Sequence, residues 1–194
     1  YYPEKQLTIK RSFITVLGRH IHELYDDDYC KHGLIIYMLT EVNGLILKMN
    51  TRLCLLEDET NINHEEIVYK LLSGFEGRGH VIYLNEYYTS YSLVKNLLKK
   101  KIHTTGRLKR ENTEYFPAVV RATLKQGEFF HQLTNEGICV MRYQDIDKKY
   151  ADFMISSECS TTMKETGSKR RSVKKPEIVV NYFSLINAIK LINF

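Results

Sequence analysis

The stretch Gly79-His80-Val81-Ile82-Tyr83-Leu84-Asn85-Glu86-Tyr87-Tyr88-Thr89-Ser90 decides the fold. Its apolar run, from Val81 to Leu84, has the length of a strand buried in the middle of a sheet. The polar pair Asn85-Glu86 ends that run. Thr89 or Ser90 can then cap a helix, because apolar residues follow at helical spacing: Tyr91, Leu93, Val94, Leu97 and Leu98. The stretch therefore predicts a strand, a polar tip and a helix.

The polar tip is a candidate site. In open α/β sheets, ligands and catalytic groups lie just past the carboxyl ends of such strands. The pattern alone leaves a second interpretation equally open, in which the tip carries no chemistry.

Length and composition set the class of protein. The chain has 194 residues, 28 basic and 23 acidic, with a formal net charge of +5. This length fits one domain with a real core, or a large piece of a bigger one. Because no leader and no run of about 20 apolar residues is present, we expect a soluble, intracellular protein. The chain starts at Tyr1 and ends within an apolar helical pattern, so we expect both ends to be cut.

Metal-binding patterns are weak throughout. The cysteines lie far apart without a CxxC motif, which predicts reduced thiols and no zinc site: Cys30, Cys54, Cys139 and Cys159. Adjacent Asp26, Asp27 and Asp28 would project in different directions, so we interpret them as a solvated loop. His64 and His80 have no companions at ligand spacing. The sequence therefore predicts no metal site.

The first half of the chain predicts three more strands and a helix. Residues 7–16 alternate as in a strand, and the runs 34–39 and 45–49 flank Asn43-Gly44, a strong hairpin turn. A helix should begin after Asn63, with Glu66 completing a capping box, and end near Gly74 and Gly77.

Two basic segments follow. Residues 99–110 hold six basic residues and no acid, which indicates either a solvated face or a phosphate-binding surface at the end of a helix. Residues 158–175 are rich in Ser, Thr and basic residues, and indicate a mobile basic loop or linker. Between them, residues 127–133, 138–143 and 151–157 predict three strands. Pro176 then introduces a final helical run.

The segment Tyr83–Ser90 resembles the piggyBac transposase segment Tyr-Met-Asp-Asn-Phe-Tyr-Thr-Ser. The resemblance continues in order along nearly the whole chain, through Thr105-Gly106, the short helix at Phe116-Pro117 and the hairpin at Gly44. It implies an RNase H-like α/β fold: a mixed sheet flanked by helices, with a β-rich insertion. It also implies a nuclear location, and a site of three Asp residues that hold Mg²⁺ for cutting and joining DNA.

The three positions that match the family's Asp residues hold Lys10, Asn85 and Lys190. Asn offers a neutral carbonyl oxygen and Lys offers only donors, whereas Mg²⁺ requires anionic oxygens. Glu86 cannot replace Asn85, because neighbouring strand residues face opposite sides. We therefore expect no intact catalytic site and no metal cofactor, and we expect the three residues to lie at one end of the sheet.

We expect three parts: a core at 1–157 that includes the start of the β-rich insertion, a basic linker at 158–176, and the start of the last core helix at 177–194. The first functional hypothesis is an inactive piggyBac transposable element-derived protein that still binds DNA non-specifically. The second is a protein-interaction or scaffold domain, and the third is an active nuclease with other acidic residues. The residues expected to contact DNA are Lys99, Lys100, Lys101, Arg107, Lys109, Arg110, Lys169, Arg170 and Arg171.

Overall fold

The computed structural model describes residues 1–15, 33–54, 63–113, 115–158, 161–168 and 171–190. The predicted aspartate loop at Asp26–Asp28 lies outside these residues.

One mixed sheet of eight strands forms the centre of the molecule, in the order β3-β2-β1-β4-β5-β8-β7-β6. β1, β4 and β5 run parallel to one another, and every other neighbouring pair is antiparallel. The strands are β1 (Gln6–Thr15), β2 (Gly33–Glu41), β3 (Ile46–Cys54), β4 (Val81–Leu84), β5 (His103–Leu108), β6 (Phe129–Leu133), β7 (Cys139–Tyr143) and β8 (Asp152–Ser156).

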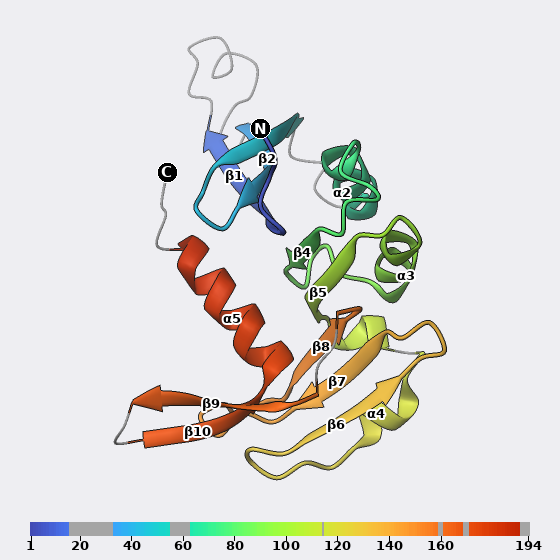
Figure 1. Ribbon diagram of the computed structural model, residues 1–194, viewed down its shortest axis with the longest axis vertical. Coiled ribbons are helices and arrows are strands. Elements are labelled where there is room, and N and C mark those ends of the chain that lie inside the picture. Colours follow the sequence, from blue (N-terminus) through green and yellow to red (C-terminus); the bar gives the residue numbers. More distant parts are fainter. Residues whose placement is uncertain (16–32, 55–62, 114, 159–160, 169–170, 191–194) are drawn as a thin grey trace, which may run out of the picture.

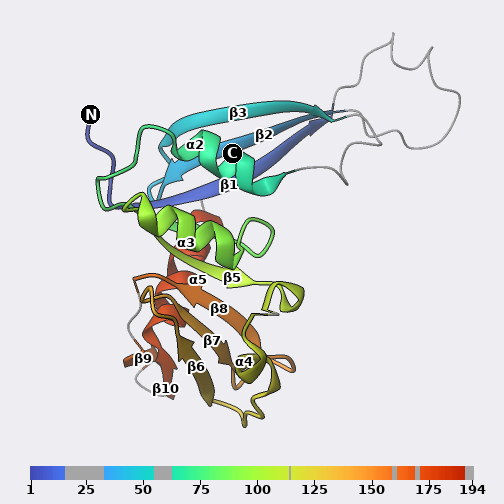
Figure 2. The same ribbon diagram turned by 90° about the vertical axis from the view of Figure 1, so that its right-hand side faces the viewer.

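Helices cover both faces of this sheet (Figures 1 and 2). They are α2 (His64–Leu72), α3 (Tyr91–Lys99), α4 (Pro117–Arg121) and α5 (Glu177–Lys190), with a short 3-10 helix, η2 (Arg110–Thr113). Ile82 and Leu84 of β4 pack in the cluster that contains α2 and α3. Val81 and Tyr83 pack instead with α5. The predicted mixed α/β sheet with flanking helices is confirmed.

The helix starts follow the predicted caps. The side-chain oxygen of Asn63 accepts a hydrogen bond from the backbone of Glu66 at 3.2 Å, and Ser90 Oγ accepts one from Leu93 N at 3.0 Å. The capping box is only half formed, because the Glu66 carboxylate pairs with Lys70. Each cap satisfies a backbone donor that the first helical turn leaves free.

Strand β5 was not predicted, because its sequence reads as part of a basic run. Thr104 and Thr105 are buried in it, and Thr105 Oγ1 lies 2.9 Å from Ser156 Oγ on β8. A hydroxyl that finds a partner can be buried at little cost. Part of the segment interpreted as a solvated face or a phosphate-binding surface is therefore a central strand of the sheet.

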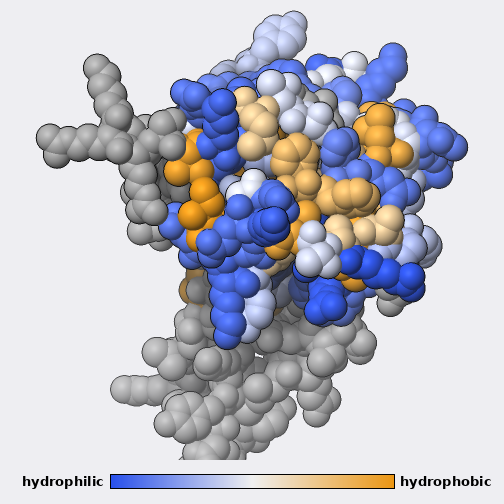
Figure 3. Space-filling view, turned by 90° about the horizontal axis from the view of Figure 1, so that it is seen from below, coloured by the Kyte–Doolittle hydropathy of each residue, from blue (hydrophilic) through white to orange (hydrophobic). Residues whose placement is uncertain are grey.

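The three strands predicted at 127–157 form β6, β7 and β8. They extend the main sheet beyond β5 rather than forming a separate layer. β6 is the edge strand and exposes Phe130 and Leu133. Figure 3, seen from this end of the molecule, shows hydrophobic residues gathered within a hydrophilic surround.

The segment predicted to be a mobile basic linker contains regular structure instead. Residues Met163–Ser168 and Arg171–Pro176 form an antiparallel hairpin, β9 and β10, that leads directly into α5 (Figure 1). Thr166 pairs with Val173, and both residue types favour strands. Lys175 anchors the hairpin by binding Asp145 at 2.7 Å. This ion pair holds the hairpin against a distant part of the chain, which the Ser- and Lys-rich local sequence does not indicate.

None of the helices in the described ranges is long and apolar enough to cross a bilayer.

Candidate functional site

Lys10 and Asn85 belong to neighbouring parallel strands. β1 and β4 pair with Leu7 opposite Ile82 and Thr8 opposite Tyr83, and Thr8 Oγ1 donates to Tyr83 O at 3.0 Å. Continuing this register by two residues sets Lys10 opposite Asn85. Strand residues alternate between faces, so Lys10 follows Thr8 onto the face that α5 covers, whereas Asn85 is the first residue after β4. Lys190 is the last residue of α5, and its side chain is outside the described part.

The Asn85 side chain holds the turn that follows β4. Its Oδ1 accepts a hydrogen bond from Tyr87 N at 3.0 Å. Its backbone oxygen accepts from Tyr88 N at 3.2 Å and from Thr89 Oγ1 at 2.7 Å. This is the local pattern by which Asx residues form turns. Asn85 therefore positions the start of α3, and its carbonyl oxygen is already engaged.

Lys10 is half-buried, and burial lowers the pKa of its ammonium group. Its neighbour Ile9 is buried on the opposite face, among the residues that contact α2 and α3. A cationic side chain thus stands where the sheet presents its carboxyl end.

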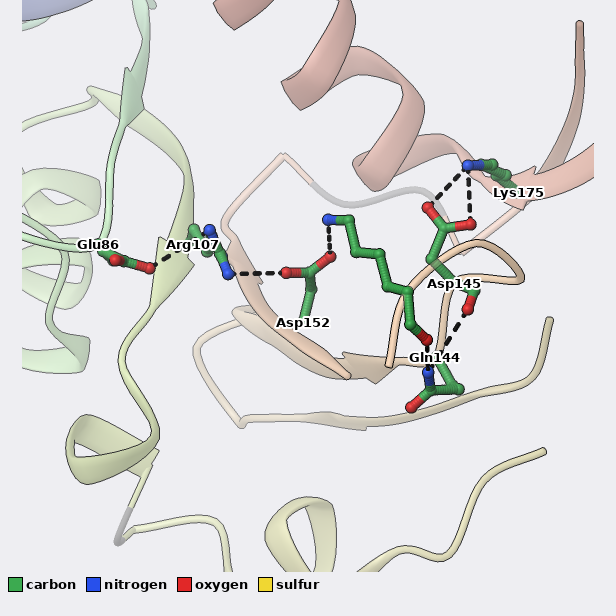
Figure 4. Close-up of polar contacts among 7 residues, drawn as sticks. Glu86, Arg107, Gln144, Asp145, Asp152 and Lys175 are labelled. Atoms are coloured by element: carbon green, nitrogen blue, oxygen red, sulfur yellow. Dashed lines mark hydrogen bonds and ion pairs between the residues drawn. The ribbon is translucent and has the colours of Figure 1, made fainter. Parts of the chain in front are cut away.

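A chain of ion pairs begins at Glu86, the residue after Asn85 (Figure 4). One guanidinium nitrogen of Arg107 lies 3.4 Å from Glu86, and the other lies 3.0 Å from Asp152. Asp152 is 2% exposed and also binds Lys148. Tyr182 of α5 lies close to these charges, and burial raises its pKa to about 12. Arg107 therefore ties the end of β4 to the start of β8 beneath α5.

The basic run at 99–110 does not form one surface. Lys99 ends α3, and Lys100 and Lys101 follow it. They lie near the amino end of β4, where Lys100 O accepts from Gly77 N at 2.9 Å. β5 then runs parallel to β4 and brings Arg107, Lys109 and Arg110 back to the carboxyl end. The crossover separates the two halves, as Figure 2 shows. Of the other basic residues, Lys169 and Arg170 lie outside the described part, and Arg171 begins β10.

A groove of about 580 Å³ opens at the carboxyl end of β5, and we call it the carboxyl-edge groove. Two residues that line it, Arg142 and Tyr150, were not among the predicted site residues. Arg142 projects from β7, and Tyr150 stands in the loop before β8. No spacing in the sequence signals them, because pairing of distant strands brings them to the same place. The full lining is Glu86, Arg107, Leu108, Lys109, Arg110, Glu111, Arg142, Tyr150, Ala151 and Phe153.

Comparison with known proteins gives a family and a fold. The family model described as transposase IS4 matches residues 1–193. This chain belongs to the transposase IS4 family. A solved piggyBac transposase synaptic complex with hairpin DNA matches with a TM-score of 0.70 and 21% identity, over 98% of this chain and 40% of that one. The expected transposase family is confirmed by the family model, and the piggyBac-type fold by the solved structure.

This member of the transposase IS4 family spans two-fifths of the piggyBac chain that it matches. An Argonaute from Marinitoga piezophila, in complex with guide RNA and target DNA, matches with a TM-score of only 0.28 and 11% identity, over 81% of this chain and 24% of that one. No curated protein matches the chain.

The chemistry of Lys10 and Asn85, two of the residues expected at the family's Asp positions, does not fit Mg²⁺. Lys10 can only donate hydrogen bonds, and Asn85 Oδ1 already accepts from Tyr87 N. The carboxylates of Glu86, which follows Asn85, and of Asp152 are both bound to Arg107. Within the described residues, no group of three or more His, Cys, Asp or Glu side chains is placed to hold a metal ion.

Proposed function

We propose that this chain is a transposase-derived domain that binds DNA without sequence preference and neither cuts nor joins it. The observation that carries the proposal is the parallel pairing of β1 with β4, in which Thr8 lies opposite Tyr83, because Lys10 and Asn85 each follow two residues later toward the carboxyl end. In an RNase H-like transposase of the DDE type, carboxylates at this edge would hold two metal ions. The domain would act on chromosomal DNA, in the nucleus.

Charge explains why catalysis should be lost. Two unit charges 4 Å apart interact by about 4 kcal/mol at an effective dielectric of about 20. A lysine in place of a ligand therefore replaces an attraction for a divalent cation with a repulsion of similar size. The half-buried position of Lys10 weakens screening by water.

The same change of charge favours phosphate. Arg107, Lys109 and Arg110 stand at the carboxyl edge, and no carboxylate in the described residues forms an ion pair with Lys109 or Arg110. Contacts from such residues to phosphate oxygens carry no sequence information. The proposed binding is therefore non-specific.

The catalytic half of the proposal is tested with purified protein, supercoiled plasmid and millimolar Mg²⁺ or Mn²⁺. We expect no nicking. Metal-dependent nicking that Glu86→Gln abolishes would overturn the proposal and support an active nuclease with other acidic residues. Glu165→Gln is the matched control, because Glu165 is an exposed carboxylate on the β9–β10 hairpin.

The binding half is tested by the salt dependence of affinity for a 30-base-pair duplex. The Lys109→Gln/Arg110→Gln variant should lose about 0.9 in the slope of log K against log salt for each phosphate contact removed. The control is Lys99→Gln/Lys101→Gln, which removes the same amount of charge near the amino end of β4. Equal effects of both variants would refute the assignment of the surface, and no binding at low salt would favour a protein-interaction domain.

A further inference from the structure

The carboxyl-edge groove is too small for a duplex and large enough for a strand. Its volume is about 580 Å³, within the range of about 300–1,000 Å³ that protein pockets use for small molecules. A B-DNA duplex, whose major groove alone is about 12 Å wide, can lie across such a groove but cannot enter it. One or two unpaired nucleotides can.

The cations of the groove are held in place before any ligand arrives. Arg142 Nη1 donates to Val120 O at 2.6 Å and to Ala122 O at 2.7 Å, and the guanidinium carbon lies 5.6 Å from the centre of the Phe153 ring. Lys109 Nζ lies 4.6 Å from the centre of the Tyr87 ring. Groups that are already ordered lose less entropy when they bind a ligand.

The net charge of the lining is positive. Four cationic side chains line the groove, against two carboxylates, Glu86 and Glu111. Arg107 already neutralises Glu86. Arg142 Nε is buried without a hydrogen-bond partner among the described residues. An anionic ligand therefore meets Lys109 and Arg110, which form no ion pair with a carboxylate of the described residues.

An exposed aromatic ring stands at the rim. Tyr150 is 74% exposed, although it lines the groove, and Lys149 Nζ lies 5.5 Å from the centre of its ring. Tyr87, under Lys109, is 59% exposed. Proteins that bind single strands combine a positive groove with aromatic rings on which bases stack.

We infer that the carboxyl-edge groove binds single-stranded DNA, with phosphates at Lys109 and Arg110 and a base stacked on Tyr150. This inference rests on the proposed DNA-binding function and names the form of DNA that the groove takes. Duplex DNA contacts the edge only through its backbone, because its bases are already stacked on one another.

The experiment compares the affinity of a labelled 12-nucleotide oligothymidine with that of a duplex hairpin of the same length. Tyr150→Leu should weaken single-strand binding by roughly 5- to 150-fold, since stacking one base on an aromatic ring contributes about 1–3 kcal/mol. It should leave duplex binding unchanged. Tyr150→Phe should keep the affinity, because the ring remains.

Tyr2→Leu is the matched control, because Tyr2 is 93% exposed and precedes β1, at the amino end of the parallel strands. A Tyr150→Leu variant with unchanged single-strand affinity, or with an equal loss for both DNA forms, would overturn the inference. Binding to duplex alone would overturn it and leave the proposed function standing. Binding to neither form would overturn both.

Discussion

The guanidinium of Arg107 lies 3.0 Å from the carboxylate of Asp152, a side chain that is 2% exposed. Asp152 begins β8 and Arg107 lies in β5, so this pair joins the two halves of the sheet where they meet. The end of β4 is joined to the same guanidinium through Glu86.

Loss of this cation should destabilise the protein. Arg107→Gln removes one of two partners of a buried carboxylate, and breaking buried pairs costs about 3–5 kcal/mol. Arg107 is 40% exposed and Lys148 remains bound, so we expect a smaller loss of about 1–2 kcal/mol in the free energy of unfolding. Denaturant titration measures it.

The control for this change is Lys70→Gln, because the Lys70–Glu66 pair is exposed on both sides. It should cost less than about 0.5 kcal/mol. Equal losses for the two variants would mean that burial of Asp152 does not matter.

Asn85→Asp should leave the fold intact. The carboxylate of Asp can accept from Tyr87 N as the amide oxygen does now, so the free energy of unfolding should change by less than about 0.5 kcal/mol. Asn85→Ala removes the acceptor and should cost about 0.5–1.5 kcal/mol. Thermal unfolding of the unchanged protein and of both variants measures these losses. Equal losses of stability for Asn85→Asp and Asn85→Ala would contradict the prediction.

Gly106→Ala should be strongly destabilising. An added Cβ would lie 2.6 Å from Thr89 Oγ1 and 2.9 Å from Thr89 Cγ2, and overpacking of this kind costs about 1–3 kcal/mol. Part of the loss should be recovered in the double variant with Thr89→Ala, which removes both contacts. A double variant whose loss is the simple sum of the two would show that the clash is not the cause.

Stability should fall below about pH 6.5 through His64. Burial, then the charges of Arg11 and Lys109, lower the pKa of this imidazole in the folded state. The unfolded chain then binds the proton more readily, so this contribution is complete above the unfolded pKa of about 6.5 and is lost as pH falls. Denaturant midpoints from pH 5 to 8 measure the effect.

His64→Gln keeps a polar side chain at the start of α2 without a titrating group, and it should flatten that pH dependence. The interpretation fails if the slope of stability against pH is the same in the His64→Gln variant as in the unchanged protein.

Local sequence determined the elements whose signal lies within a few neighbouring residues. The buried run Val81–Leu84, the Asn43-Gly44 turn and the caps Asn63 and Ser90 each fix a backbone conformation through adjacent residues, so they were predictable. The resemblance also gave Lys10 and Asn85 as the positions of interest.

Tertiary structure alone decided which residues share the site. The α3 crossover carries Lys99 away from the carboxyl edge, and β5 carries Lys109 back, although they are ten residues apart in the chain. Strand pairing sets Arg142 and Tyr150 beside Arg107, and an ion pair with Asp145 anchors a hairpin that reads as a linker. These contacts join residues that are distant in sequence. Because the free energy of strand pairing depends on the partner strand, such contacts leave no pattern in the local sequence.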